Sequence, residues 1–139
     1  MYSAPYHEIL DNLYIGNFTS IQSRKFNMIV NCTKEYEISF PKDYIKDDPL
    51  DSSTLLSVLE NTDILEKIDN TLKNNQSVLV HCSKGQQRSC AVVACYLIRF
   101  FQMKTDTAIE YIKSKRPIAF FGNVNLIEAI TNFYQTYNL

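Results

Sequence analysis

Residues 81–89, His-Cys-Ser-Lys-Gly-Gln-Gln-Arg-Ser, place a thiol and a guanidinium within one short segment. Cys82 follows an apolar run at 78–80, and Arg88 stands six residues further on, at the start of a long apolar stretch. This pattern predicts a buried strand that ends at the cysteine, a loop, and a helix that begins near the arginine. Backbone N–H groups and the helix dipole make such a loop a binding site for anions.

The residue types in this loop suit a phosphate group. Gly85 lets the loop curl so that successive amides converge on one oxyanion, and Arg88 offers a planar fork of donors to two phosphate oxygens. The predicted phosphate-binding residues are Ser83, Lys84, Gly85, Gln86, Gln87 and Arg88.

The same environment favours a nucleophilic cysteine. A thiol at a helix N-terminus beside a guanidinium can have its pKa lowered from about 8.5 to about 3.5–7.5. Cys82 would then attack a bound phosphate in line and form a phosphocysteine. We expect Ser89 to donate a hydrogen bond to the sulfur and ease its departure, and His81 to orient the loop through backbone hydrogen bonds. The alternative, a buried core thiol, leaves Gly85, Arg88 and Ser89 unexplained.

The composition sets limits on the rest of the molecule. The chain has 139 residues, of which 45% are hydrophobic, and its net charge is −1. We expect one globular domain over 1–139 and no nucleic-acid partner. No apolar run approaches the roughly 20 residues of a membrane span, and no secretory signal is recognisable at the N-terminus. We therefore expect a cytoplasmic protein that does not contact membranes, as a monomer or weak homodimer.

Hydrophobic periodicity and turn signals predict an α/β fold, with a mixed, largely parallel sheet of about five strands and helices on both faces. Strands are expected at 8–16 (two, broken by Asp11-Asn12), 28–32, 36–46 and 77–81. A short helix is expected at 18–26, and longer helices at 52–74, at 87–102, from 105 to the stop at Pro117, and at 123–137.

The segment 81–89 resembles the His-Cys-x-x-Gly-x-x-Arg-Ser signature of the cysteine-dependent protein tyrosine phosphatases, and the chain is most similar to their small dual-specificity branch. Residues 13–17, 29–33 and 108–117 resemble the family's "LYLGN", "VLNVT" and "AFEFVKSRRP" motifs in the same order. The resemblance covers nearly the whole chain. It implies a protein phosphatase that needs no metal or other cofactor and acts on phosphotyrosine and phosphoserine or phosphothreonine in phosphoprotein substrates.

The resemblance also implies a general acid about thirty residues before the cysteine. Asp51 lies 31 residues upstream of Cys82 and is the preferred candidate, followed by Asp48 and Asp47. The family's Pro-x-x-Asp spacing would place Ser52 there instead, and Asp51 also suits the N-cap of the helix expected at 52–74. The deprotonated acid would then activate water against the phosphocysteine.

Several further expectations accompany this interpretation. Either Asn123 or Asn125 matches the family's asparagine near the site, or this segment is a structural turn. Phe120 and Phe121 either flank the pocket or belong to the core. His7 is expected to be an ordinary surface residue. The other cysteines, Cys32, Cys90 and Cys95, are expected in the core; the alternative is that one forms a disulfide with oxidised Cys82.

The alternatives on function are a pseudophosphatase that only binds phosphoproteins, and a phosphoinositide or RNA phosphatase of the same superfamily. A composition that favours Lys, Asn and Ile suits an AT-rich genome. Such a genome would suit a large DNA virus or a protist. If the protein is viral, we expect it in the host cytoplasm or the virion.

Overall fold

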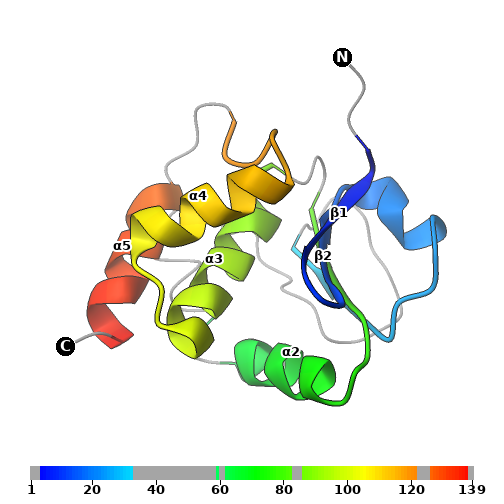
Figure 1. Cartoon of the computed structure of the whole chain (residues 1–139), viewed down its shortest axis with the longest axis horizontal. Coiled ribbons are helices and arrows are strands. Elements are labelled where there is room, and N and C mark those ends of the chain that lie inside the picture. The colour runs from blue at the N-terminus through cyan, green and yellow to red at the C-terminus, as the bar shows by residue number, and fades with distance from the viewer. Residues whose placement is uncertain (1–3, 33–58, 60–61, 83–85, 122–125, 138–139) are drawn as a thin grey trace.

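A computed structural model describes residues 4–32, 59, 62–82, 86–121 and 126–137 (Figure 1). Along the chain, the elements in these ranges are β1 (Tyr6–Leu10), β2 (Leu13–Gly16), the 3-10 helix η1 (Phe18–Gln22), β3 (Met28–Asn31), α2 (Ile64–Lys73), β4 (Val78–His81), α3 (Arg88–Phe101), α4 (Thr105–Lys115) and α5 (Leu126–Tyr137).

The described strands form one sheet in the order β1-β2-β4-β3. The hairpin of β1 and β2 is antiparallel, and Asn12 takes the left-handed conformation (φ 70°) that its tight turn needs. β4 lies between β2 and β3 and runs parallel to both. The central strand is therefore the one that leads directly to Cys82, and the ends of three parallel strands meet beside it.

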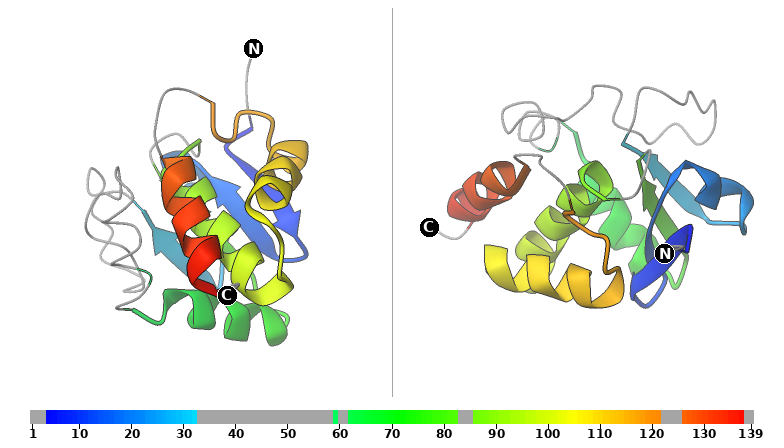
Figure 2. Two further views of the ribbon diagram at one scale, coloured as in Figure 1. Left: turned by 90° about the vertical axis from the view of Figure 1, so that its left-hand side faces the viewer. Right: turned by 90° about the horizontal axis from the view of Figure 1, so that it is seen from above.

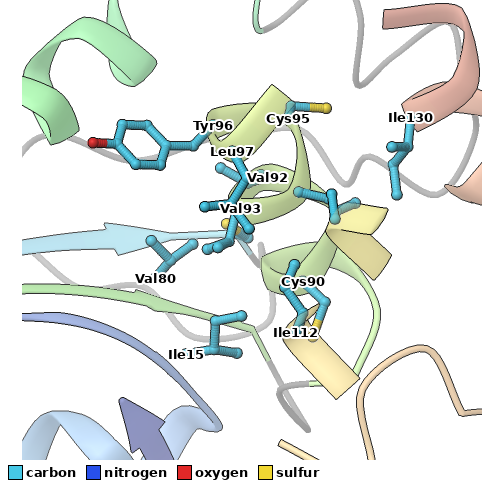
Figure 3. Packing of buried hydrophobic residues seen from close by; sticks show 14 of the residues in the cluster. Ile15, Val80, Cys90, Val92, Val93, Cys95, Tyr96, Leu97, Ile112 and Ile130 are labelled. Carbon is cyan, nitrogen blue, oxygen red and sulfur yellow. The ribbon is translucent and has the colours of Figure 1, made fainter. Parts of the chain in front are cut away.

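Side chains alternate between the two faces of the sheet. Val78 and Val80 of β4 face the main core, whereas Leu79 joins Tyr14 and Ile29 in a small cluster on the other face. Helix α3 packs on the main-core face of the sheet. Its residues Cys90 and Val93 belong to the same buried cluster as Ile15 and Val80 of the sheet, Ile112 of α4 and Ile130 of α5 (Figure 3). Helix α5 packs against α3 on the side away from the sheet, and α4 contacts both α3 and β1 (Figure 2). The opposite face is covered by η1, whose Ile21 packs on the small cluster.

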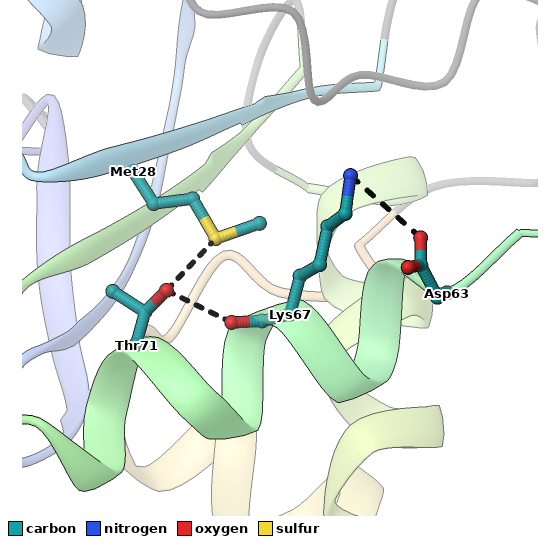
Figure 4. A network of polar contacts seen from close by, with 4 residues as sticks. All are labelled: Met28, Asp63, Lys67 and Thr71. Carbon is teal, nitrogen blue, oxygen red and sulfur yellow. Dashed lines mark hydrogen bonds and ion pairs between the residues drawn. The ribbon is translucent and has the colours of Figure 1, made fainter.

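Helix α2 joins this core through both apolar and polar contacts. Its apolar residues Ile64, Leu65 and Ile68 are buried. The Thr71 hydroxyl donates to the Lys67 carbonyl oxygen at 2.8 Å and lies 3.5 Å from the sulfur of Met28 in β3 (Figure 4). An ion pair between Lys67 and Asp63 (3.7 Å) spans the first turn.

The α/β fold class predicted from the sequence is confirmed, with four described strands instead of about five. The strands expected at 36–46 lie outside the described residues. The single helix expected over 52–74 is wrong, because Thr62 and Asp63 are not helical and α2 begins at Ile64. The short helix at 18–26 is a 3-10 helix that ends at Gln22. Among the described residues, no helix combines the length and apolar character that crossing a bilayer requires.

Candidate active site

The sheet holds Cys82 by its backbone at the end of β4. The Cys82 N–H donates to the carbonyl oxygen of Gly16, the last residue of β2, at 3.3 Å. On the other side, the Cys32 N–H donates to the carbonyl oxygen of His81 at 2.8 Å. Because both neighbouring strands are parallel to β4, these bonds extend the sheet ladder to the cysteine itself. Cys82 is therefore fixed by strands on both sides.

The side chain of Cys82 meets the first turn of α3. Its sulfur lies 3.1 Å from the hydroxyl oxygen of Ser89, within hydrogen-bond distance for a sulfur atom. Ser89 is fully buried, and Cys82 is 2% exposed. Arg88, the first residue of α3, is 9% exposed. The structure thus brings the sequence-predicted residues Cys82, Ser89 and Arg88 to one strand–helix junction, where the N-terminal end of α3 adds positive potential.

His81 is buried on the other side of the same strand end and is fully shielded from solvent. Burial lowers the pKa of its imidazole to about 4, so the ring is neutral at neutral pH. The backbone of the adjacent Cys82 partly opposes this shift. The predicted role of His81, orienting the loop, remains a prediction because residues 83–85 lie outside the described residues.

The other three cysteines are free thiols with no exposed surface. Burial raises the pKa of Cys32, Cys90 and Cys95, and the proximity of Cys82 adds to the shift at Cys32 and Cys90. Each thiol is therefore protonated at neutral pH. Their predicted place in the core is confirmed.

The sequence interpretation missed the contact between this junction and the turn after α4. The Phe120 N–H donates to the Gln86 carbonyl oxygen at 2.6 Å, and the side-chain amide of Gln87 donates to the Phe121 carbonyl oxygen at 2.5 Å. Phe120 belongs to the core, whereas Phe121 is 73% exposed. The only signal in the sequence was the pair of aromatic residues after the Arg-Pro motif, which did not show which one is buried.

The sequence interpretation also missed a buried cation behind the site. Arg116 is fully buried and donates to the carbonyl oxygen of Ala4 at 3.1 Å and to Nδ1 of His7 at 2.7 Å. Because a guanidinium only donates, Nδ1 of His7 must be unprotonated. Burial and the charge of Arg116 both lower the pKa of His7. The expectation that His7 is an ordinary surface residue is therefore wrong.

Several predicted site residues cannot be placed, because they lie outside the described residues. These are Ser83, Lys84 and Gly85 of the loop, the acid candidates Asp47, Asp48 and Asp51 with Ser52, and Asn123 and Asn125.

Residues 13–136 match the family described as the dual specificity phosphatase catalytic domain. A protein of Invertebrate iridescent virus 6, named as tyrosine phosphatase 123R, is 32% identical over 94% of this chain and 93% of its own length. A Slingshot protein phosphatase homolog of Xenopus laevis is 29% identical over 80% of this chain, which spans only 17% of that protein. The crystal structure of human DUSP28 superimposes with a TM-score of 0.81 at 16% identity, covering 99% of this chain and 98% of the other, and shows the same fold.

Proposed function

This chain belongs to the dual specificity phosphatase catalytic-domain family and is a dual-specificity protein phosphatase; we propose that it acts through a phosphocysteine intermediate at Cys82. The observation that carries the proposal is the 3.1 Å contact between the Cys82 sulfur and the Ser89 hydroxyl, directly beside the N-terminal end of α3. A buried core cysteine needs no such hydroxyl, no adjacent arginine and no helix N-terminus.

In the proposed reaction, the Cys82 sulfur attacks phosphorus while Arg88 and the loop amides hold the phosphate oxygens. The P–O bond to the substrate breaks, and the departing oxygen takes a proton from Asp51. Water, deprotonated by the same carboxylate, then attacks the phosphocysteine, and the P–S bond breaks to release inorganic phosphate. Ser89 donates to the sulfur as negative charge returns to it.

The site residues use no metal in this scheme. Attack, phosphate binding and proton transfer are all assigned to side chains of the chain, with Asp48 and Asp47 as the alternatives to Asp51. The proposed substrates are phosphoproteins that carry phosphotyrosine, phosphoserine or phosphothreonine.

Hydrolysis of p-nitrophenyl phosphate in the presence of EDTA, from pH 5 to pH 8, tests the mechanism. Cys82→Ser should abolish turnover, whereas Cys95→Ser, a matched change in a buried cysteine on α3, should retain it. Trapping of a ³²P-labelled phosphocysteine in the wild type, and its absence in Cys82→Ser, identifies the nucleophile. Full activity in Cys82→Ser would refute the proposal.

The general acid is tested with Asp51→Asn, Asp48→Asn and Asp47→Asn. The variant that lacks the acid should lose the basic limb of the pH profile and be slowed more on alkyl than on aryl phosphates, because an alkoxide is the poorer leaving group. If Asp51→Asn leaves the profile unchanged, the assignment moves to Asp48 or Asp47.

The same assays separate the alternatives. A wild type without turnover that binds phosphopeptides is a pseudophosphatase, and turnover of phosphoinositides or RNA 5′-phosphates without turnover of phosphopeptides indicates another branch of the superfamily. We also propose a cytoplasmic location, in the host cell or virion if the protein is viral, and a monomer or weak homodimer. Four free cysteines and the viral relative support the location.

A further inference from the structure

The turn after α4 is fastened to the end of the phosphate-binding segment. Phe120 bonds to the backbone of Gln86 and Phe121 bonds to the side chain of Gln87, and these two glutamines directly precede Arg88. Two further bonds, from the Ala119 N–H to the Arg116 carbonyl oxygen and from the Phe121 N–H to the Ile118 carbonyl oxygen, close the turn itself. Figures 1 and 2 show the turn beside the N-terminal end of α3. The position of Phe121 is thus tied to that of Arg88.

The two adjacent phenylalanines of this turn differ in burial: the side chain of Phe120 is in the core, and that of Phe121 is exposed to solvent. Phe120 has φ 62°, a left-handed conformation that is unfavourable for a bulky residue and persists only where the surroundings hold it. Its side chain is 8% exposed and joins the core, whereas the next residue, Phe121, is 73% exposed. Among the described residues, Phe121 is the most exposed large apolar side chain.

We propose that Phe121 is a specificity-determining residue whose ring packs against the aromatic ring of a phosphotyrosine substrate. This inference rests on the proposed function. An exposed aromatic side chain beside a phosphate site offers a contact that a phosphorylated phenol can use and that phosphoserine or phosphothreonine, which have no ring, cannot. The site accepts both classes of phosphoresidue, and Phe121 biases it towards phosphotyrosine.

The exposed aromatic side chain of Phe101 provides the matched control. It is 49% exposed and ends α3 at the opposite end from Arg88. Fourteen residues of helix place it roughly 20 Å from the phosphate-binding end. Phe101→Ala removes the same chemical group at a distance from the site.

The experiment compares kcat/KM for two peptides that differ only in carrying phosphotyrosine or phosphothreonine. In Phe121→Ala, we expect about a five- to tenfold loss for the phosphotyrosine peptide, the range an aromatic pair supports, and little change for the phosphothreonine peptide. Phe121→Tyr should keep the wild-type ratio, and Phe101→Ala should change neither value. Inhibition by orthovanadate, which has no ring, should be the same in all four proteins.

Two outcomes of the kinetic comparison would overturn this inference. Equal losses on both peptides would mean that Phe121 acts through the loop, and an unchanged ratio would mean that its ring does not touch substrate. Binding of the same peptides to Cys82→Ser, with and without Phe121→Ala, provides a readout without turnover. A wild type with no activity but with this binding preference would refute the proposed catalysis and support the role of Phe121. Activity without the preference would support the proposed catalysis and refute the role of Phe121.

Discussion

At the scale of single residues, the contact between Ser89 and Cys82 should affect the two chemical steps of the proposed reaction to different degrees. The hydroxyl oxygen is 3.1 Å from the sulfur, and both groups are buried. A hydrogen bond to this sulfur matters most when the sulfur leaves phosphorus and carries negative charge. The second step should therefore depend on Ser89 more than the first.

Ser89→Ala should slow the hydrolysis of the phosphocysteine by about 10- to 100-fold, because a hydrogen bond to a charged group contributes about 1.5–3 kcal/mol. Stopped-flow measurement with p-nitrophenyl phosphate should show a burst of one equivalent of product followed by slow turnover. Ser89→Thr, which keeps the hydroxyl, is the control. A variant that slows the burst itself, with no accumulation of phosphoenzyme, would contradict this role.

At the scale of elements, strand β3 and helix α3 bury three thiols around a fourth. Cys32 follows β3, and Cys90 and Cys95 lie on α3. All three are fully buried, and burial raises the pKa of each. The same packing that completes the core also suppresses their reactivity.

Because Cys82 is the proposed nucleophile and the other three thiols stay protonated in the core, iodoacetamide should add one label per native chain, at Cys82, and four after unfolding in urea. Peptide mass spectrometry locates the label, and Cys82→Ser should leave the native protein unlabelled. Rapid labelling of Cys90 or Cys95 in the native protein would show that α3 opens from the sheet.

The end of strand β2 has almost no room for a side chain at Gly16. A Cβ there would lie 2.4 Å from the Ser20 hydroxyl oxygen and 2.9 Å from the Pro5 carbonyl oxygen. Gly16→Ala must therefore displace η1 or the residues before β1, at a cost of about 1–3 kcal/mol in the free energy of unfolding. Because the Gly16 carbonyl holds the Cys82 N–H, kcat/KM should fall as well.

Urea unfolding and phosphatase assays of Gly16→Ala check both effects. The control is Ser23→Ala, at an exposed position at the end of η1, which should change stability by no more than about 0.5 kcal/mol. A Gly16→Ala variant with unchanged stability would mean that η1 or the residues before β1 can shift to accommodate the methyl group without a cost in stability.

Local patterns in the sequence were sufficient to predict most of these elements. Strands β3 and β4 are buried along their whole length and follow from short apolar runs in the sequence, and α3 follows from its long apolar stretch. The helix expected over 52–74 was too long, because periodicity continues through Thr62 and Asp63 although the backbone there is not helical. A local hydrophobic pattern therefore indicates which residues are buried more reliably than where a helix begins or ends.

At the scale of the whole molecule, both histidines bind protons less readily in the folded protein than in the unfolded chain. Burial lowers the pKa of His81 from 6.5 to about 4, and burial with the charge of Arg116 lowers that of His7. The unfolded state therefore binds more protons below about pH 6.5, so stability rises with pH across this window and is lost as the pH falls towards 4.

For His81 alone, the loss of unfolding free energy between pH 7 and pH 5 should be about 2 kcal/mol. Urea unfolding at the two pH values measures it, and His81→Gln should reduce the difference whatever its own stability. His7→Gln isolates the second histidine. An unchanged difference in His81→Gln would show that carboxylates alone cause the acid sensitivity.

The parts of the site that the sequence did not predict depend on contacts between distant segments. Arg116 and His7 are 109 positions apart, so the burial of this pair has no local signature. Whether Phe120 or Phe121 enters the core is decided by the left-handed backbone at Phe120, which the sequence of two adjacent phenylalanines does not reveal. The Cys82–Ser89 contact, by contrast, follows from a short motif at a strand–helix junction.

The strand order also has a consequence for folding during synthesis on the ribosome. β2 and β3 are synthesised before β4, but they do not pair with each other, because β4 lies between them in the sheet. The sheet therefore cannot close until residues 78–81 have been synthesised, and the next residue added is the proposed nucleophile. Nascent chains released before that point lack both the central strand and the reactive thiol, so premature termination there cannot yield a shortened but active phosphatase.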